Sequence, residues 1–320
     1  MLRQILERLF SVVERIVTAV LYPYCLLRER HRTGTQVPIL MYHQIGHPPS
    51  SMPERQDCVT PARFERQLRA LLDSGYQIIS LGRLIQLLND SPDALRRCVA
   101  LTFDDGYHGQ FRNAYPILRR YRVPATFFLV GESVGSHAVL PHLDLEGGRM
   151  GEDDRLTEWR PLSWDEAREL AHNAMEVGSH GASHRSLGHM RQDEVMDEVR
   201  RSKEKLEARL GVRVEVFAYP FGSRAYGDFD PSIQAVLRDA GYRGACTTVV
   251  GRSDRDADRF ALRRIPVEEG DGPFRIRAKV IGAFDWTGPV KELWQRLLPR
   301  KERVDLELAT AATSAGGTLR

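Results

Sequence analysis

The chain has 320 residues, 42% hydrophobic and 28% charged, an ordinary composition for a globular protein and long enough for one large α/β domain. Its net charge of +3 implies no polyanionic partner, and the sequence carries no phosphate loop, dinucleotide fingerprint or nucleic-acid-binding module. The four cysteines are scattered without a Cys-x-x-Cys pair, which favours reduced, buried thiols and a reducing compartment.

The first predicted element is a helix over residues 1–30, with apolar residues at helical spacing and charged residues on its other face. Its longest uncharged run, Ile16 to Leu27, contains Pro23 and is too short to span a bilayer, and no signal-peptide cleavage site follows. Two interpretations stay open. The helix lies on a membrane surface through residues 1–27, or it packs on the domain or on a partner. We expect a cytoplasmic protein, peripheral at the inner face of the membrane under the first interpretation.

Strands and helices then alternate along a domain predicted over residues 37–300, after a helix-and-linker segment over 1–36. The predicted strands are 37–42, 78–79, 98–103, 124–130, 175–179, 214–219, 244–250 and 262–267. The helices between them begin at capping residues such as Thr60, Ser80, Ser163 and Asp230. This alternation is typical of a parallel sheet or barrel with crossover helices. A polar insertion at about 134–160 is a candidate flap, and residues 301–320 are predicted to be a disordered tail.

Two motifs follow predicted strands and carry the chemistry. The first is Thr-Phe-Asp-Asp-Gly over residues 102–106, and the second places His180 and His184 four residues apart. The carboxyl ends of parallel strands meet at one rim, so the motifs are expected to converge. One carboxylate and two imidazoles suit a divalent metal such as zinc, and the second carboxylate is then free to act as a base. Taken singly, the motifs have plain alternatives, a turn at Asp-Asp-Gly and structural histidines.

With these motifs, the stretch from about Val37 to about Val267 resembles the polysaccharide deacetylases, also called the NodB-homology domain or family 4 carbohydrate esterases. The resemblance implies an irregular (β/α) barrel that removes N-acetyl groups from amino sugars. It implies one divalent metal ion, zinc in the first place, with cobalt or nickel as alternatives. Carried over residue by residue, it makes Asp104 the catalytic base and Asp105, His180 and His184 the metal ligands.

A third motif, Phe-Ala-Tyr-Pro-Phe-Gly over residues 217–222, matches the Pro-Tyr/Phe-Gly end of a family motif. The resemblance implies that the backbone N–H of Phe221 stabilises the oxyanion and that substrate contacts come from the rest of the turn. Those predicted substrate-binding residues are Tyr219, Pro220 and Gly222.

The arginine that usually begins this family motif is replaced by Ala218, which raises the question of what orients Asp104. Arg264, in the predicted strand 262–267, is our candidate replacement. A surface salt bridge is the alternative interpretation of Arg264.

The histidine that supplies the acid late in the family's sequence is missing here. Instead, His43 follows Tyr42 after the first predicted strand, which resembles the subgroup that deacetylates poly-N-acetylglucosamine exopolysaccharides. We assign His43 as the general acid, moved to the other end of the chain as in a circular permutation. A barrel allows this because its first and last strands are neighbours. A structural histidine is the alternative.

The sequence therefore predicts a metal-dependent N-deacetylase acting on N-acetylhexosamine glycans, whether polysaccharide, oligosaccharide or lipid-linked. The alternatives are the same metal chemistry on a small non-sugar amide, or a non-catalytic glycan-binding module, which Ala218 would favour.

Overall fold

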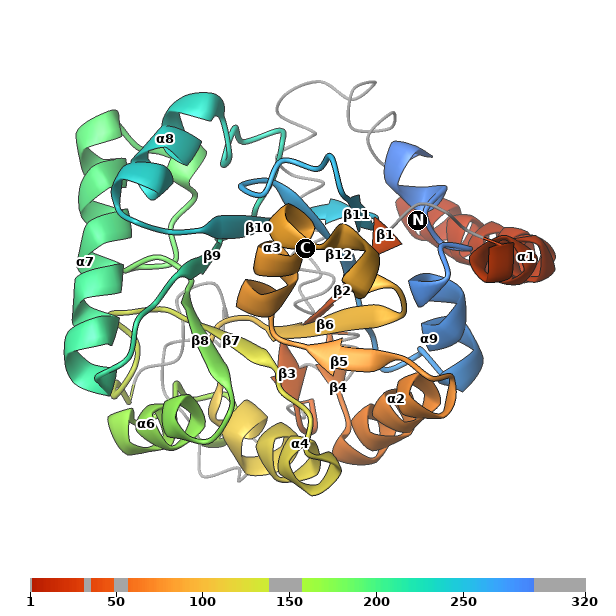
Figure 1. Cartoon of the computed structure of the whole chain (residues 1–320), viewed down its shortest axis with the longest axis horizontal. Coiled ribbons are helices and arrows are strands. Elements are labelled where there is room, and N and C mark those ends of the chain that lie inside the picture. The colour runs from red at the N-terminus through yellow and green to blue at the C-terminus, as the bar shows by residue number, and fades with distance from the viewer. Residues whose placement is uncertain (1, 32–35, 49–56, 138–156, 291–320) are drawn as a thin grey trace.

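A parallel sheet of eight strands forms the centre of the fold (Figure 1). The computed structural model describes residues 2–31, 36–48, 57–137 and 157–290, and in the first helix it describes the side chains of residues 12–29. The strands of the sheet are β2 (Ile39–Tyr42), β5 (Gln77–Ile79), β6 (Cys98–Phe103), β7 (Thr126–Leu129), β8 (Glu176–Ser179), β9 (Val216–Ala218), β10 (Gly244–Val250) and β12 (Leu262–Pro266).

The sheet closes into a barrel because β2 pairs with β12 on one side and with β6 on the other. The ring runs β2, β12, β10, β9, β8, β7 and β6, and β5 pairs with the beginning of β6. Every residue of β6 is buried, as expected for a strand covered on both faces. The predicted (β/α) barrel is confirmed, including the neighbouring positions of its first and last strands.

Six of the helices in the described ranges pack around the outside of the barrel (Figure 1). They are α2 (Pro61–Asp73), α4 (Tyr115–Tyr121), α6 (Trp164–His172), α7 (Gln192–Leu210), α8 (Pro231–Asp239) and α9 (Pro273–Val280). Helix α2 begins after Thr60 as predicted, with Pro61 in its first turn. Helix α9 was not predicted, because it buries Lys279 together with its apolar residues and so lacks a clear apolar stripe.

Helix α3 (Leu81–Asp90) closes the end of the barrel where the strands begin. Glu176, at the start of β8, accepts hydrogen bonds from the Gly82 N–H (3.0 Å) and the Thr126 hydroxyl (2.7 Å). The buried leucines of α3 pack with residues of β2, β6, β7, β9, β10 and β12 in one cluster. The opposite end, where the strands finish, is therefore left for a functional site.

Two short strand pairs lie outside the barrel. β1 (Gln36–Val37) pairs antiparallel with β11 (Ser253–Asp254), and β3 (Gln44–Ile45) pairs with β4 (Cys58–Val59). The single strand predicted over 37–42 is thus two strands that separate at Pro38, which has no N–H to donate to a continuous ladder.

The first helix, α1 (Leu2–His31), lies outside the barrel beside α9 (Figure 1). Its buried Glu14 pairs with Arg275 of α9 at 3.0 Å, and Leu21 and Tyr22 pack against the core. The helix continues through Pro23. Within the described ranges, no helix combines the length and the apolar character needed to cross a bilayer. The predicted helix is confirmed, and one of its sides packs on the domain.

Two predicted features fall largely or entirely outside the described residues. The candidate flap over 134–160 is described only at 134–137 and 157–160, and the predicted tail over 301–320 is not described.

Glu166 connects the start of α6 to the loop after β6. It completes the predicted capping box with Ser163 and pairs with the His108 imidazole, Nδ1 to Oε1, at 2.8 Å. Burial works to raise the pKa of the Glu166 carboxyl, but the hydrogen bonds from His108 and from the Ser163 N–H outweigh it and lower the pKa to about 2.

We expect Glu166→Gln to lower the free energy of unfolding by about 1–2 kcal/mol near neutral pH. Because the folded-state pKa is depressed, the wild-type advantage is complete above the unfolded value of 4.5 and is lost as the pH falls toward about 2. Urea unfolding at stepped pH measures the difference, with the exposed Glu204→Gln as control. A difference that does not shrink across that window would contradict this account.

Candidate active site

Asp104 and Arg264 form a buried ion pair at the end of the barrel where the strands finish. Asp104 directly follows β6, and Arg264 lies in β12. Two parallel hydrogen bonds join them, from Arg264 Nη1 to Asp104 Oδ1 at 2.6 Å and from Nη2 to Oδ2 at 2.7 Å. Arg264 has no exposed surface, so the alternative of a surface salt bridge is wrong. The predicted pairing with Asp104 is what the structure shows.

This pairing keeps the Asp104 carboxylate charged. Burial would raise the pKa of Asp104, but the Arg264 guanidinium holds that pKa below its usual range. The imidazoles of His180 and His43 act in the same direction. The result is an ionised carboxylate whose two oxygens are fixed in direction by a bidentate donor.

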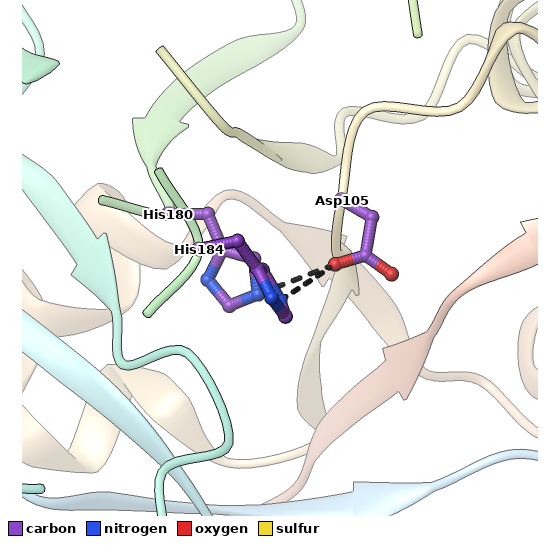
Figure 2. Close-up of side chains that lie close together, drawn as sticks. All are labelled: Asp105, His180 and His184. Atoms are coloured by element: carbon purple, nitrogen blue, oxygen red, sulfur yellow. Dashed lines mark ion pairs between the residues drawn. The ribbon is translucent and has the colours of Figure 1, made fainter. Parts of the chain in front are cut away.

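Asp105, His180 and His184 converge beside this pair (Figure 2). The Oδ1 atom of Asp105 lies 3.5 Å from His180 Nε2 and 3.2 Å from His184 Nε2. Ligands of a tetrahedral zinc ion, each about 2.0–2.2 Å from the metal, are roughly 3.3 Å apart. The two carboxylate–imidazole distances are close to this value, and all three donor atoms lie within 4.8 Å of one another, so the cluster is a possible site for a divalent metal.

The protonation of His180 also fits ligation. Its Nδ1–H donates to the Ala218 carbonyl at 2.8 Å, which leaves Nε2 directed toward Asp105. Burial outweighs the nearby carboxylates and lowers the pKa of His180 to about 4, so the ring is neutral, as a metal ligand must be.

Three residues of the site have left-handed backbone conformations that are uncommon outside glycine. They are Asp105 (φ +75°), His184 (φ +60°) and Phe221 (φ +61°). Such conformations cost about 1–3 kcal/mol each and persist where surrounding contacts enforce them. Here the left-handed residues lie in the turns that follow three different strands, β6, β8 and β9, and these turns bring the residues of the site together.

Two buried carboxylates, neither of them predicted, hold these turns. Glu198 of α7 accepts the Ser183 N–H at 2.6 Å, next to His184. Asp228 accepts the Ser186 hydroxyl at 2.5 Å and the Ser223 N–H at 2.8 Å, and so joins the loops after β8 and β9. Neither carboxylate belongs to a recognisable motif, so the sequence offered no signal for them.

Gln110 is a third unpredicted positioning residue. Its buried amide Nε2 donates to the His43 carbonyl at 2.8 Å and to the Asp104 carbonyl. It opens a π-helical turn over Gln110–Ala114, a distortion that often occurs at functional sites. Through Gln110, the loop after β2 and the loop after β6 are held as one unit.

The 217–222 motif ends in a tight turn beside the possible metal site. The Gly222 N–H donates to the Pro220 carbonyl at 2.7 Å, and the Phe221 ring lies 5.3 Å from the His184 ring. A Cβ on Gly222 would stand 2.7 Å from the Thr248 nitrogen, so only glycine fits. The turn therefore brings the Phe221 backbone to the site.

The predicted substrate contact of Tyr219 is corrected by the structure. Tyr219 is fully buried, and its hydroxyl donates to the Phe260 carbonyl at 2.9 Å. It supports the turn from inside the core. Pro220 and Gly222 are also buried and form the turn itself.

His43 follows β2, the strand between β12 and β6. It is half-buried and close enough to Asp104 to affect the pKa of that carboxyl. Adjacent strands therefore carry Arg264, His43 and Asp104, as the predicted barrel closure requires.

Comparison with known proteins agrees with this geometry. Residues 92–245 match the family model described as polysaccharide deacetylase. The chain carries a polysaccharide deacetylase domain. Deacetylases of this family are metal-dependent hydrolases that act on amide bonds, in agreement with the Asp/His/His cluster.

Three relatives illustrate the range of similarity to this deacetylase domain. The YxkH protein of Bacillus subtilis strain 168 is 26% identical over 235 residues, which cover 73% of this chain and 72% of the relative. The poly-beta-1,6-N-acetyl-D-glucosamine N-deacetylase of Escherichia coli strain K12 is 27% identical over 123 residues. That match spans 38% of this chain and only 17% of the Escherichia coli enzyme. The Streptococcus pyogenes deacetylase PplD, solved with acetate, shares the fold with a TM-score of 0.64 at 22% identity, over 78% of this chain and 99% of PplD.

We expect His184→Ala to lose most of its bound divalent metal, because one of three protein ligands is removed. Metal analysis of purified protein after loading with zinc, cobalt or nickel measures the loss. His189→Ala, an exposed histidine near the same loop, is the matched control. Equal metal content in His184→Ala and the wild type would refute the metal site.

Proposed function

We propose that this domain is a metal-dependent N-deacetylase of N-acetylhexosamine glycans, with poly-N-acetylglucosamine as the leading substrate class. The observation that carries the proposal is an ionised, bidentately held Asp104 next to the cluster of Asp105, His180 and His184. The name of the Escherichia coli relative supports the substrate class.

The roles of the side chains follow from their positions. A divalent metal held by Asp105, His180 and His184 would supply Lewis acidity toward the amide oxygen and lower the pKa of a water molecule. Asp104 accepts the proton of the attacking water, while Arg264 keeps the carboxylate in one orientation.

The remaining roles concern the developing charge and the leaving group. The Phe221 N–H donates to the acyl oxygen as negative charge develops there. His43 gives a proton to the departing sugar nitrogen, because an amine anion is a poor leaving group. The carbon–nitrogen bond breaks, and acetate and a free amino sugar result.

Zinc is the metal that we propose. One carboxylate oxygen and two imidazole nitrogens form a set of three protein ligands that leaves positions open for water and substrate, which is typical of catalytic zinc. Cobalt and nickel bind the same donor atoms, so both are included in the activity assay below.

The non-catalytic alternative loses its main support. That interpretation rested on Ala218, which stands where the family has an arginine. Arg264 supplies a guanidinium to Asp104 from another strand, so the arginine is relocated rather than lost. The small-amide alternative depended on the 134–160 insertion, most of which lies outside the described residues, and no observation favours it.

Asp104→Asn tests the function and the base together. It should release acetate from N-acetylglucosamine oligomers about 10²–10⁴-fold more slowly than the wild type while keeping its metal, since Asp104 lies outside the ligand cluster. Mass spectrometry of oligomers incubated with zinc-, cobalt- or nickel-loaded protein measures the release. If the loaded wild type leaves every N-acetylated glycan intact but hydrolyses a small N-acetyl amide, the small-amide alternative replaces this proposal.

His43→Ala should separate a proton donor from a structural histidine. We expect a strong loss of rate on acetamides and a smaller loss on an activated aryl acetate ester, whose leaving group needs no proton. Metal content should not change. Parallel assays of both substrates decide the question, and equal losses on amide and ester would remove His43 from the role of acid.

A further inference from the structure

Exposed apolar side chains are concentrated on one helix. Nine large hydrophobic side chains are exposed in the described part of the chain, and all but Met196 and Phe274 belong to α1. Phe274 extends the same surface, because its ring lies 4.7 Å from that of Tyr22. We call this surface the outer face of α1; it is formed by Val12, Val13, Ile16, Val20, Tyr24, Leu26, Leu27 and Phe274. An apolar surface gathered in this way is uncommon on a monomer and marks an interaction site.

Polar contacts, together with the packing of Leu21 and Tyr22 on the core, fix which side of α1 faces outward. Glu14 pairs with Arg275, which also binds Asp271 at 2.8 Å, and the Tyr76 hydroxyl donates to Glu29 at 3.4 Å. A helix held by hydrophobic burial alone would turn its apolar stripe to the core. Here α1 turns its two described carboxylates toward the domain, while Ile16 and Val20 remain 59% and 71% exposed.

The charges beside the outer face are basic. Glu14 and Glu29 turn toward the domain, whereas Arg15 and Arg28 are exposed. At 3.6 residues per turn, the two arginines flank the line through Val12, Ile16 and Val20, one on each side. An apolar stripe with basic flanks is typical of helices that lie in the headgroup region of an anionic bilayer.

A second copy of the chain suits this surface less well. Pairing two outer faces would bring Arg15 and Arg28 of both copies to the edges of one interface. The described carboxylates of α1, Glu14 and Glu29, turn toward the domain and would not pair with them there. Anionic phosphates, in contrast, complement these arginines.

We propose that the outer face of α1 docks the domain on an anionic phospholipid surface, with the helix axis in the plane of the membrane. The basic flanks contact lipid phosphates, and the aliphatic side chains enter the boundary of the acyl region. The docking does not depend on the deacetylase activity, because neither the outer face nor its flanks include a residue of the candidate active site.

Vesicle co-sedimentation of the full chain tests the proposal. The vesicles contain phosphatidylcholine with phosphatidylglycerol, or phosphatidylcholine alone. The key variant is Ile16→Ser with Val20→Ser, and the matched control is Met196→Ser, which removes an exposed apolar side chain from α7. We expect the wild type and the control to bind the anionic vesicles, and the double variant to bind at least about tenfold more weakly. Arg15→Gln with Arg28→Gln should bind more weakly and with less dependence on salt.

Three results would overturn the proposal. Wild-type protein that binds neither vesicle, or a double variant that binds as well as the wild type, overturns the proposal. Sedimentation velocity tests for a second copy of the chain on this surface. If the wild type self-associates and the double variant does not, the outer face of α1 binds a second copy, and the membrane proposal is overturned. Equal unfolding midpoints confirm that the variants are folded. No glycan is used, so these outcomes are separate from the fate of the proposed deacetylase activity.

Discussion

The buried ion pair between Arg264 and Asp104 is the interaction on which the site depends. Removing two charges from water costs several kcal/mol per ion, so such a pair is tolerated only where hydrogen bonds satisfy both groups. Arg264 meets this condition by also donating to the Thr247 carbonyl at 2.9 Å and to the Thr102 hydroxyl at 3.3 Å. The pair joins β12 to the end of β6, on either side of β2. The same ion pair therefore connects the strands that close the barrel and orients the proposed base. A shift in the register of these strands would disrupt both the closure and the orientation.

The other residues of the site lie on loops around this pair, and side chains from neighbouring elements stabilise those loops. Strained turns at Asp105 and His184 direct the three possible metal ligands to one point. Glu198 and Asp228 stabilise the loops that make those turns possible, and Gln110 joins the backbones of the proposed acid and base. Because α3 closes the other end of the barrel, the site lies at one end of the barrel and the apolar cluster around α3 lies at the other.

Local patterns in the sequence predicted most of the fold. A strand such as β10 is indicated by a short apolar run, and a helix such as α6 by the capping residue Ser163 before it, so a few neighbouring residues were enough to predict them. The ligand cluster and Arg264 could also be predicted, since motifs at strand ends must meet at one rim. Gln110 could not, because its contacts are to backbone carbonyls that only the fold brings near. Tyr219 was misassigned because the motif that contains it gives no sign of which neighbouring side chains face the core.

The central claim is that Arg264 holds Asp104 in place of the arginine that Ala218 replaces. A double-mutant cycle of Arg264→Met and Asp104→Asn, in which the free energy of unfolding of each variant is measured, tests this claim most directly. Arg264→Met alone leaves a buried, unpaired carboxylate and should cost about 3–5 kcal/mol. Adding Asp104→Asn removes that charge, so the double variant should be more stable than the sum of the single losses by at least about 1 kcal/mol. Losses that add within about 0.5 kcal/mol would contradict the account.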